Sequence, residues 1–157
     1  MVELDEALRV LTALEREQVQ YALVGSMAMA IHGVIRATQD MDFFVDPSPD
    51  NVARLRRALA SVYADPCIDE ITTEDLGGDY PAVQYAPPEG DFWFDIMSRL
   101  GERFHYDQLE VQTVDFRGVK VRVATPRMLY RMKRDTVRPQ DKVDATALKR
   151  AFDLEED

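Results

Sequence analysis

The chain has 157 residues, of which 46% are hydrophobic, and we expect one domain over residues 1–157 with a core of ordinary size. No apolar stretch approaches the length of a membrane span, and a single cysteine excludes an internal disulfide, so the composition indicates a cytoplasmic protein with no membrane contact. The formal net charge of −10 argues against indiscriminate binding to nucleic acids.

Hydrophobic periodicity and turn residues predict the elements of the first half of the chain. They are a helix over residues 3–18, a strand over 21–24, a helix over 27–32, a strand over 40–45 and a helix over 51–62. The acidic stretch from Asp65 to Tyr80 lacks a clear period, and we expect a loop there.

The second half of the chain predicts strands followed by two helices. Strands over 82–85 and 92–97 are expected to pair antiparallel, and strands over 111–116 and 119–123 to form a hairpin. Thr125 and Pro126 are typical N-cap and first-turn residues of the next helix, and Pro139 begins the last one, with Val143 and Leu148 among its apolar residues. The predicted fold class is α+β, with a mixed β-sheet flanked by α-helices.

Gly25-Ser26 lies where the first predicted strand meets the second predicted helix. An apolar run that ends in Gly-Ser and continues as a helix is typical of a strand, a tight turn and a helix. The backbone N–H groups at such a helix start have no partner within the helix, so they can hold phosphate oxygens. Gly25 and Ser26 are therefore candidate phosphate-binding residues.

Asp40 and Asp42 lie two residues apart on the next predicted strand. Because side chains alternate along a strand, both carboxylates lie on one face, while Met41 and Phe43 lie on the other. Neighbouring carboxylates repel each other and are tolerated best where a divalent cation neutralises them. A phosphate-binding turn followed by a carboxylate pair indicates a site for a nucleoside triphosphate and a metal ion.

The order of these residues, Leu-Val-Gly-Ser-x-Ala-x-x-x-His-Gly-x-x-Arg-x-Thr-x-Asp-x-Asp, resembles the signature of the polymerase-β-type nucleotidyltransferase superfamily. It is most similar to the AbiEii-type toxin nucleotidyltransferases and their small single-domain relatives, and the likeness covers nearly the whole chain. Gly25-Ser26 stands where this family usually has Gly-Gly. The resemblance implies a nucleotidyltransferase fold, Mg²⁺ as cofactor, a nucleoside triphosphate as substrate and a cognate toxin or antitoxin as partner.

Asp95 is the candidate for a third acid, because it is a lone carboxylate in the apolar segment Phe92–Met97, where burial without a partner would be costly. The resemblance implies that the matching strand supplies an acid that helps to hold the catalytic metal and takes the proton of the attacking hydroxyl. Asp40, Asp42 and Asp95 would thus be the catalytic residues and the ligands of Mg²⁺. An exposed aspartate at a strand end is the alternative for Asp95.

Two basic residues are candidates for contacts with the triphosphate. Lys133 lies on the helix after the predicted hairpin, where the AbiEii-type relatives have a phosphate-contacting lysine. Arg36 could contact phosphate or form an ion pair that orients one of the strand carboxylates. Asp141 and Asp144 match a family run, Arg-x-Lys-Asp-x-x-Asp, in which Gln140 replaces the lysine, and both a catalytic and a helix-packing role are open for them.

Positive charge is concentrated late in the chain, since residues 117–150 include eleven basic and three acidic residues. Arg127, Arg131 and Arg134 share one face of the predicted helix at its 3.6-residue period, and Arg138 follows the end of this helix. We predict that these four arginines bind a polyanionic acceptor, with tRNA as the leading candidate. A merely solvated helix face is the alternative.

Three functions are compatible with the sequence. The first is transfer of an NMP from an NTP to a hydroxyl of RNA or protein, within a toxin–antitoxin module. The second is transfer to a small molecule such as an aminoglycoside, and the third is nucleotide binding or protein interaction without catalysis. The presence of all three acids favours an active enzyme.

Overall fold

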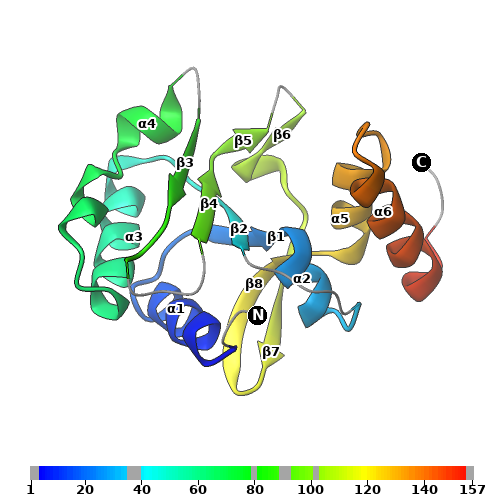
Figure 1. Ribbon diagram of the computed structural model, residues 1–157, viewed down its shortest axis with the longest axis horizontal. Coiled ribbons are helices and arrows are strands. Elements are labelled where there is room, and N and C mark those ends of the chain that lie inside the picture. The colour runs from blue at the N-terminus through cyan, green and yellow to red at the C-terminus, as the bar shows by residue number, and fades with distance from the viewer. Residues whose placement is uncertain (1–3, 35–39, 79–80, 89–92, 101–102, 155–157) are drawn as a thin grey trace.

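The structure is a computed structural model, and it describes residues 4–34, 40–78, 81–88, 93–100 and 103–154. Six strands form one mixed sheet in the order β3-β4-β2-β1-β8-β7, and two short strands form a separate ribbon (Figure 1). The sheet strands are β1 (Tyr21–Val24), β2 (Asp40–Val45), β3 (Ala82–Tyr85), β4 (Trp93–Met97), β7 (Val111–Phe116) and β8 (Val119–Ala124). The ribbon strands are β5 (Arg99–Leu100) and β6 (Phe104–His105).

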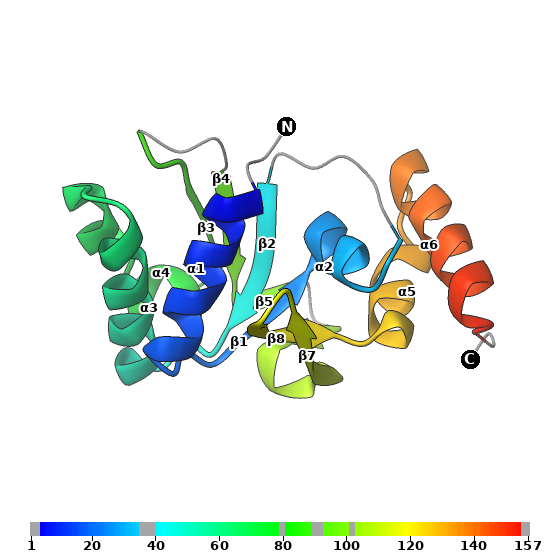
Figure 2. The ribbon, with the colours of Figure 1, turned by 90° about the horizontal axis from the view of Figure 1, so that it is seen from below.

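Helices lie on both sides of this sheet, with α1, α3 and α4 on one side and α2, α5 and α6 on the other (Figure 2). Their bounds are α1 (Leu4–Arg16), α2 (Gly25–Ile31), α3 (Pro49–Val62), α4 (Thr73–Gly77), α5 (Pro126–Arg134) and α6 (Pro139–Phe152). Two short 3₁₀ helices, η1 (Pro66–Glu70) and η2 (Tyr106–Gln108), complete the fold. The α+β class and the mixed sheet are thus confirmed. No helix among the described residues is long and apolar enough to span a membrane.

The central strands explain where the core lies. In β2 and β4 the residues that alternate with the aspartates, Met41, Phe43, Phe94 and Ile96, have no solvent exposure. Burying side chains of this size stabilises the fold by roughly 1.5–3 kcal/mol each, so this face of the sheet fixes the register of the strands. The opposite face of the same strands carries the three aspartates together with the side chains of Phe44, Trp93 and Met97.

The predicted loop over residues 65–80 is wrong, because this segment contains η1 and α4. The Asp65 carboxylate accepts a hydrogen bond from the backbone N–H of Cys67, and the Thr72 hydroxyl accepts one from that of Asp75. These caps and the buried side chains of Ile68 and Leu76 stabilise helices of five residues each. Such helices are too short to show a hydrophobic period in the sequence.

Helix α6 also differs from its apolar pattern. Leu148 is buried, but Val143 is 61% exposed, whereas Asp144 is only 2% exposed. The reason lies in the contact of α6 with α5, where a buried ion pair takes the place of an apolar one.

Candidate active site

The three predicted acids come together at the centre of the sheet. Strands β2 and β4 are parallel neighbours, and Asp42 is the register partner of Asp95. Asp40 precedes Asp42 on the same face of β2, and one carboxylate oxygen from each of the three residues lies within 4.8 Å of the others. All three side chains are partly buried. Alternation along two adjacent strands is therefore sufficient to build a triad of carboxylates.

Gly25 begins α2 directly beside this triad. Strand β1 pairs antiparallel with β2, and Val24 is the register partner of Asp42. Gly25 has a φ of +73°, which L-residues with a side chain rarely adopt, and a Cβ at this position would overlap Oδ2 of Asp42. The glycine is thus required both by the turn and by the close approach of the carboxylate.

The crowding of the acids changes their protonation. Burial, together with the negative charges of Asp40 and Asp95, raises the pKa of Asp42 to about 8. Burial and the charge of Asp40 also raise the pKa of Asp95. The cluster therefore resists full deprotonation, because burial and neighbouring carboxylates both disfavour the charged form of each acid.

A cavity of about 460 Å³ opens above the triad. Its walls come from β1 and α2, from the strands with the aspartates, from β5 and from the α5–α6 corner. Among the predicted site residues it is lined by Gly25, Ser26, Asp40, Asp42, Asp95, Lys133 and Arg138. The candidate residue Arg36 lies outside the described residues. The structure thus brings together the acids, the Gly-Ser turn and two of the predicted basic residues.

Lys133 is held in this wall by the two aspartates of α6. Its Nζ lies 2.9 Å from Oδ2 of Asp144 and 3.4 Å from Oδ1 of Asp141, and the lysine side chain is 13% exposed. Gln140 donates a hydrogen bond of 3.0 Å to the other oxygen of Asp144, and the Thr136 hydroxyl lies 2.9 Å from Asp141. The aspartates therefore have at least a packing role, and Gln140 takes part in the same network.

The arginines predicted to bind an acceptor are dispersed. Arg127 forms an ion pair of 2.7 Å with Glu110, whose pKa is lowered by this contact. Arg134 lies against the ring of Tyr130 and outside the cavity. It lines a different hollow, between α5 and α6. Arg138 lines the cavity itself, and Arg131 lines an adjoining hollow.

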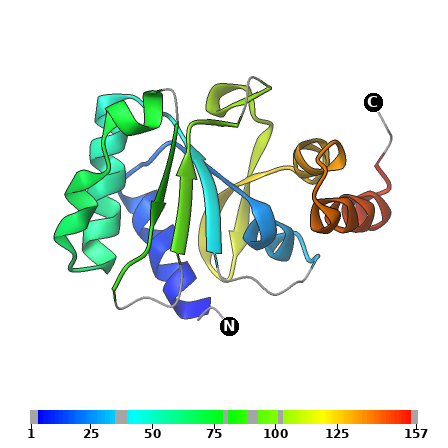
Figure 3. The same cartoon turned by 45° about the horizontal axis from the view of Figure 1, so that its top comes forward.

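Sequence reasoning missed the residues of the β5–β6 ribbon, which follows directly after β4. Arg99 and Leu100 line the cavity beside Asp95, and Arg99 donates a hydrogen bond to the backbone oxygen of Gly78. Strands of two residues leave no periodic signal, so only the position of Arg99 close to Asp95 in the chain could have suggested it. The ribbon extends from β4 toward α5 (Figure 3).

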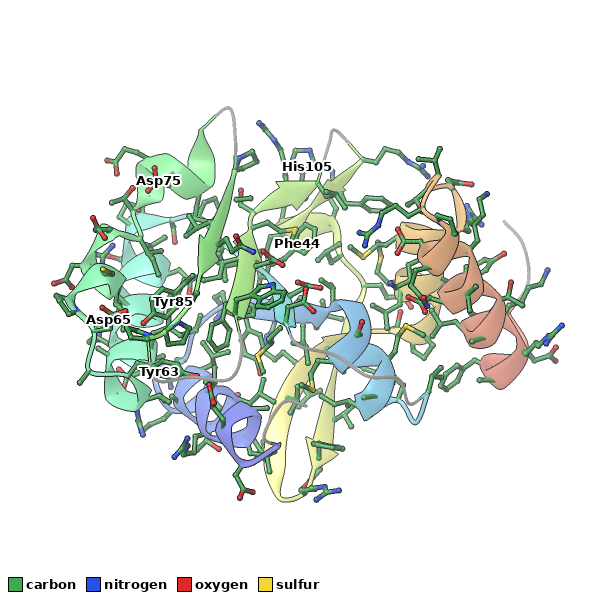
Figure 4. All side chains as sticks on the ribbon, viewed as in Figure 1. Phe44, Tyr63, Asp65, Asp75, Tyr85 and His105 are labelled. Atoms are coloured by element: carbon green, nitrogen blue, oxygen red, sulfur yellow. The ribbon has the colours of Figure 1, made fainter. Side chains whose placement is uncertain are left out.

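A second polar cluster lies away from the triad, beside α3 (Figure 4). Tyr63 donates a hydrogen bond to the buried carboxylate of Glu6, and Tyr85 donates one of 2.8 Å to Asp65. Each hydroxyl therefore satisfies an acid, and the rings of Tyr63 and Tyr85 pack edge to face. This cluster stabilises the packing of α1 and α3 and does not contribute to the cavity.

The histidine of the sequence motif has a packing role as well. His32 donates from Nε2 to the backbone oxygen of Ala124, 2.8 Å away, because a carbonyl oxygen can only accept. Its ring also packs edge to face on Phe152. His32 thus connects the end of α2 with the end of β8 and with α6.

Solved structures with a similar fold include nucleotidyltransferases and proteins described as similar to them. They include ANT(2″)-Ia in complex with adenylyl-2″-tobramycin, at 13% identity and a TM-score of 0.54 over 96% of this chain and 90% of that one. A proposed nucleotidyltransferase from Thermotoga maritima has 15% identity and a TM-score of 0.55 over 97% and 94%. A nucleotidyltransferase-like antigen from Paracoccidioides brasiliensis has 17% identity and a TM-score of 0.51 over 92% and 76%. Identities this low establish the fold alone.

No curated protein sequence has a significant match to this chain. The family comparison is more specific, since the family of the nucleotidyl transferase AbiEii toxin, type IV toxin–antitoxin system, matches residues 8–156. This span includes the Gly-Ser turn, all three aspartates and Lys133. The chain belongs to the AbiEii nucleotidyltransferase family.

Proposed function

We propose that this nucleotidyltransferase uses Mg²⁺ to move an NMP from an NTP to a hydroxyl group of RNA, as one component of a toxin–antitoxin module. The observation that carries the proposal is the meeting of Asp40, Asp42 and Asp95 in one cavity with the Gly25-Ser26 turn. A nucleoside triphosphate needs both parts, because its charge must be neutralised while its phosphates are held in place.

The donor atoms of the triad suit Mg²⁺. Three carboxylate oxygens within 4.8 Å offer hard, negatively charged ligands, and the raised pKa values of Asp42 and Asp95 indicate a need for positive charge. Mg²⁺ usually binds through a few carboxylates, with phosphate oxygens and water as its other ligands. When bound, it neutralises the phosphates and favours deprotonation of the acceptor hydroxyl.

Four of the residues that line the cavity then have a role in the reaction. Ser26 and the backbone at Gly25 hold the β- and γ-phosphates. Lys133 donates to the same phosphates from α5, where the α6 aspartates balance its charge and fix its position. Asp95 takes the proton of the acceptor hydroxyl, whose oxygen forms a bond to the α-phosphorus. The bond from this phosphorus to the bridging oxygen of the β-phosphate breaks, and pyrophosphate leaves with the electron pair.

The identity of the acceptor separates this proposal from the second candidate. The complex of ANT(2″)-Ia contains adenylyl-2″-tobramycin, which favours a small-molecule acceptor for a protein of the same fold. The description of this chain's family instead names a toxin of a toxin–antitoxin system. This favours a macromolecular acceptor and an antitoxin as partner. We therefore place RNA or protein before an aminoglycoside.

The test is incubation of the protein with each α-labelled NTP and Mg²⁺, in the presence of total RNA, cell protein or an aminoglycoside. Label in the RNA fraction is expected, and Asp42→Asn should transfer none. Label in the protein fraction or on the aminoglycoside would show that RNA is not the acceptor, but the protein would still be a nucleotidyltransferase. If no fraction carries label with any NTP, the proposed transfer is refuted.

A further inference from the structure

A second hollow adjoins the cavity above the triad. It has a volume of about 400 Å³ and lies between the β5–β6 ribbon and α5. Three of its residues, Leu100, Met132 and Thr136, also line the first cavity, so the two spaces share a wall and are neighbours. The remaining lining residues, which belong to this side pocket alone, are Arg103, Phe104, Arg131 and Asp135.

The side pocket combines an apolar floor with guanidinium groups. Phe104 and Met132 are partly buried against the core, and Leu100 is 49% exposed although it is apolar. The guanidinium carbon of Arg103 lies 5.3 Å from the centre of the Phe104 ring, and Arg131 adds a second cation from α5. A flat ring with an attached phosphate fits this combination, because bases stack on aromatic and guanidinium planes and arginine binds phosphate.

The charge of the pocket argues against a polycation such as an aminoglycoside. The lining residues include two arginines and one acid, Asp135, which pairs with Arg134 at 3.5 Å and with Arg103 at 3.3 Å. Both partners of this pair are more than half exposed, so the contact contributes little and can give way to a phosphate. A ligand with several ammonium groups would be repelled by the same arginines.

The position of the pocket relates it to the acceptor. The chain runs from Asp95 on β4 through Ser98 directly into β5, and Tyr106 donates a backbone hydrogen bond of 3.0 Å to Ser98 that anchors the far side of the ribbon. His105, labelled in Figure 4, lies on this ribbon. The pocket therefore adjoins the side of the cavity formed by the Asp95 strand and its continuation, where the attacking hydroxyl must arrive.

We propose that the side pocket is the acceptor subsite and that it holds the terminal nucleotide of an RNA strand. The base packs on Leu100 and on the Arg103 guanidinium that lies over the Phe104 ring, and its phosphate contacts Arg131. This inference rests on the proposed transfer reaction, and it specifies the acceptor that the reaction uses. It also assigns a function to the ribbon and selects Arg131 from the arginines of α5.

The test is binding of a short fluorescent single-stranded RNA, measured by anisotropy without NTP, and of Mg²⁺ with a non-hydrolysable NTP, measured by calorimetry. Arg103→Ala and Arg131→Ala should each weaken RNA binding roughly tenfold and reduce its salt dependence by about one counterion. Phe104→Leu keeps an apolar side chain against the core and should weaken RNA binding about as much, because it loses the aromatic face. Nucleotide binding should stay at the wild-type level in all three.

Arg57→Ala is the matched control. Arg57 is 61% exposed and forms one ion pair of 3.4 Å, whereas Arg103 is 61% exposed and forms one of 3.3 Å, but Arg57 lies on α3 and lines neither space. An equal loss of RNA affinity in Arg57→Ala would show a general charge effect and overturn the subsite. Loss of nucleotide binding in Arg103→Ala and Phe104→Leu would assign the pocket to the base of the NTP instead.

Two further outcomes separate this inference from the proposed function. RNA binding that is unaffected by the pocket variants, or absent in the wild type, overturns the subsite even if the protein transfers label to another acceptor. Conversely, RNA binding that depends on the pocket in a protein that binds no Mg²⁺–nucleotide would contradict the transferase mechanism and keep the RNA site.

Discussion

The carboxylate of Asp42 occupies space that any side chain at position 25 would need, so the Gly-Ser turn and the carboxylate triad depend on each other. Because Gly25 also has a φ of +73°, the sequence can build this contact only with glycine. Burial and the negative charges of Asp40 and Asp95 also raise the pKa of the Asp42 carboxyl group. Substitutions at these positions should therefore affect stability and binding in separable ways.

Gly25→Ala is expected to lower the free energy of unfolding by about 1–3 kcal/mol, because it adds backbone strain and displaces Asp42. Nucleotide affinity in the presence of Mg²⁺ should fall roughly tenfold or more, as is usual when a metal ligand loses its orientation. Gly33→Ala is the control, since Gly33 has a φ of +90° and, apart from its chain neighbours, no atom of the described residues lies within 4 Å of the place that its Cβ would take. Gly33→Ala should have the same backbone strain but keep the wild-type nucleotide affinity. An equal loss of nucleotide affinity in both variants would contradict the role of the contact between position 25 and Asp42.

Asp42→Asn is expected to remove Mg²⁺–nucleotide binding and to stabilise the metal-free protein by up to about 5 kcal/mol at pH 8. The folded wild type binds the Asp42 proton more tightly than the unfolded chain, so its stability falls as the pH rises from about 4 to about 8. The advantage of the variant should therefore grow across this window. Urea denaturation in EDTA at several pH values measures it, and a pH-independent difference would contradict the crowding of the triad.

Asp95→Asn should give a different phenotype, because the asparagine keeps the size of the side chain but cannot take a proton. We expect nucleotide affinity to stay largely intact and the chemical step to slow by about a hundredfold or more. Single-turnover transfer measured beside calorimetric binding separates the two effects. Near-normal turnover would place the general base on another residue.

At the scale of elements, the packing of α5 on α6 determines where Lys133 lies. Its ammonium group is enclosed by Asp141 and Asp144, and the Asp144 carboxylate is almost fully buried. A buried ion pair adds little net stability, but removal of Asp144 leaves Lys133 with the more distant Asp141 alone and takes the acceptor from Gln140. A substitution of Asp144, which does not line the cavity, should therefore destabilise the α5–α6 contact.

Asp144→Ala is expected to lower the free energy of unfolding by about 3 kcal/mol and to weaken nucleotide binding through a displaced Lys133. Asp135→Ala, which removes exposed ion pairs from the end of α5, should cost less than about 1 kcal/mol. Chemical denaturation of both variants measures the contrast. Similar small losses in the two would show that the buried pair does not fix α5 on α6.

Individual elements differ in how far the sequence could predict them. The strand aspartates were predictable, because alternation with Met41, Phe43 and Phe94 defines their face without any knowledge of the fold. Helix capping by Thr125 was equally readable, and its side chain does accept from the backbone N–H of Met128. The Lys133–Asp144 ion pair could not be predicted from the sequence, because it depends on how α5 and α6 pack. The β5–β6 ribbon has no period, so the side pocket was also hidden.

At the scale of the whole molecule, charge is segregated along the chain. Residues 117–150 carry a formal charge of +8, against −10 for the complete sequence. The structure shows that part of this positive charge is used internally, by Arg127 with Glu110 and by Lys133 with the α6 aspartates. We therefore expect an acceptor to meet a smaller basic surface than the sequence indicates.

Catalysis by the carboxylate triad can be tested through release of pyrophosphate from each NTP, with and without Mg²⁺ and total RNA, by the wild type and by Asp42→Asn and Asp95→Asn. We predict that at least one NTP releases pyrophosphate, and that this release requires both Mg²⁺ and RNA. The amount of pyrophosphate should equal the amount of label gained by the RNA. Either substitution should abolish the release or slow it severely. Release that continues unchanged without Mg²⁺, or in the two aspartate variants, would contradict the assignment of the carboxylate triad as the catalytic centre.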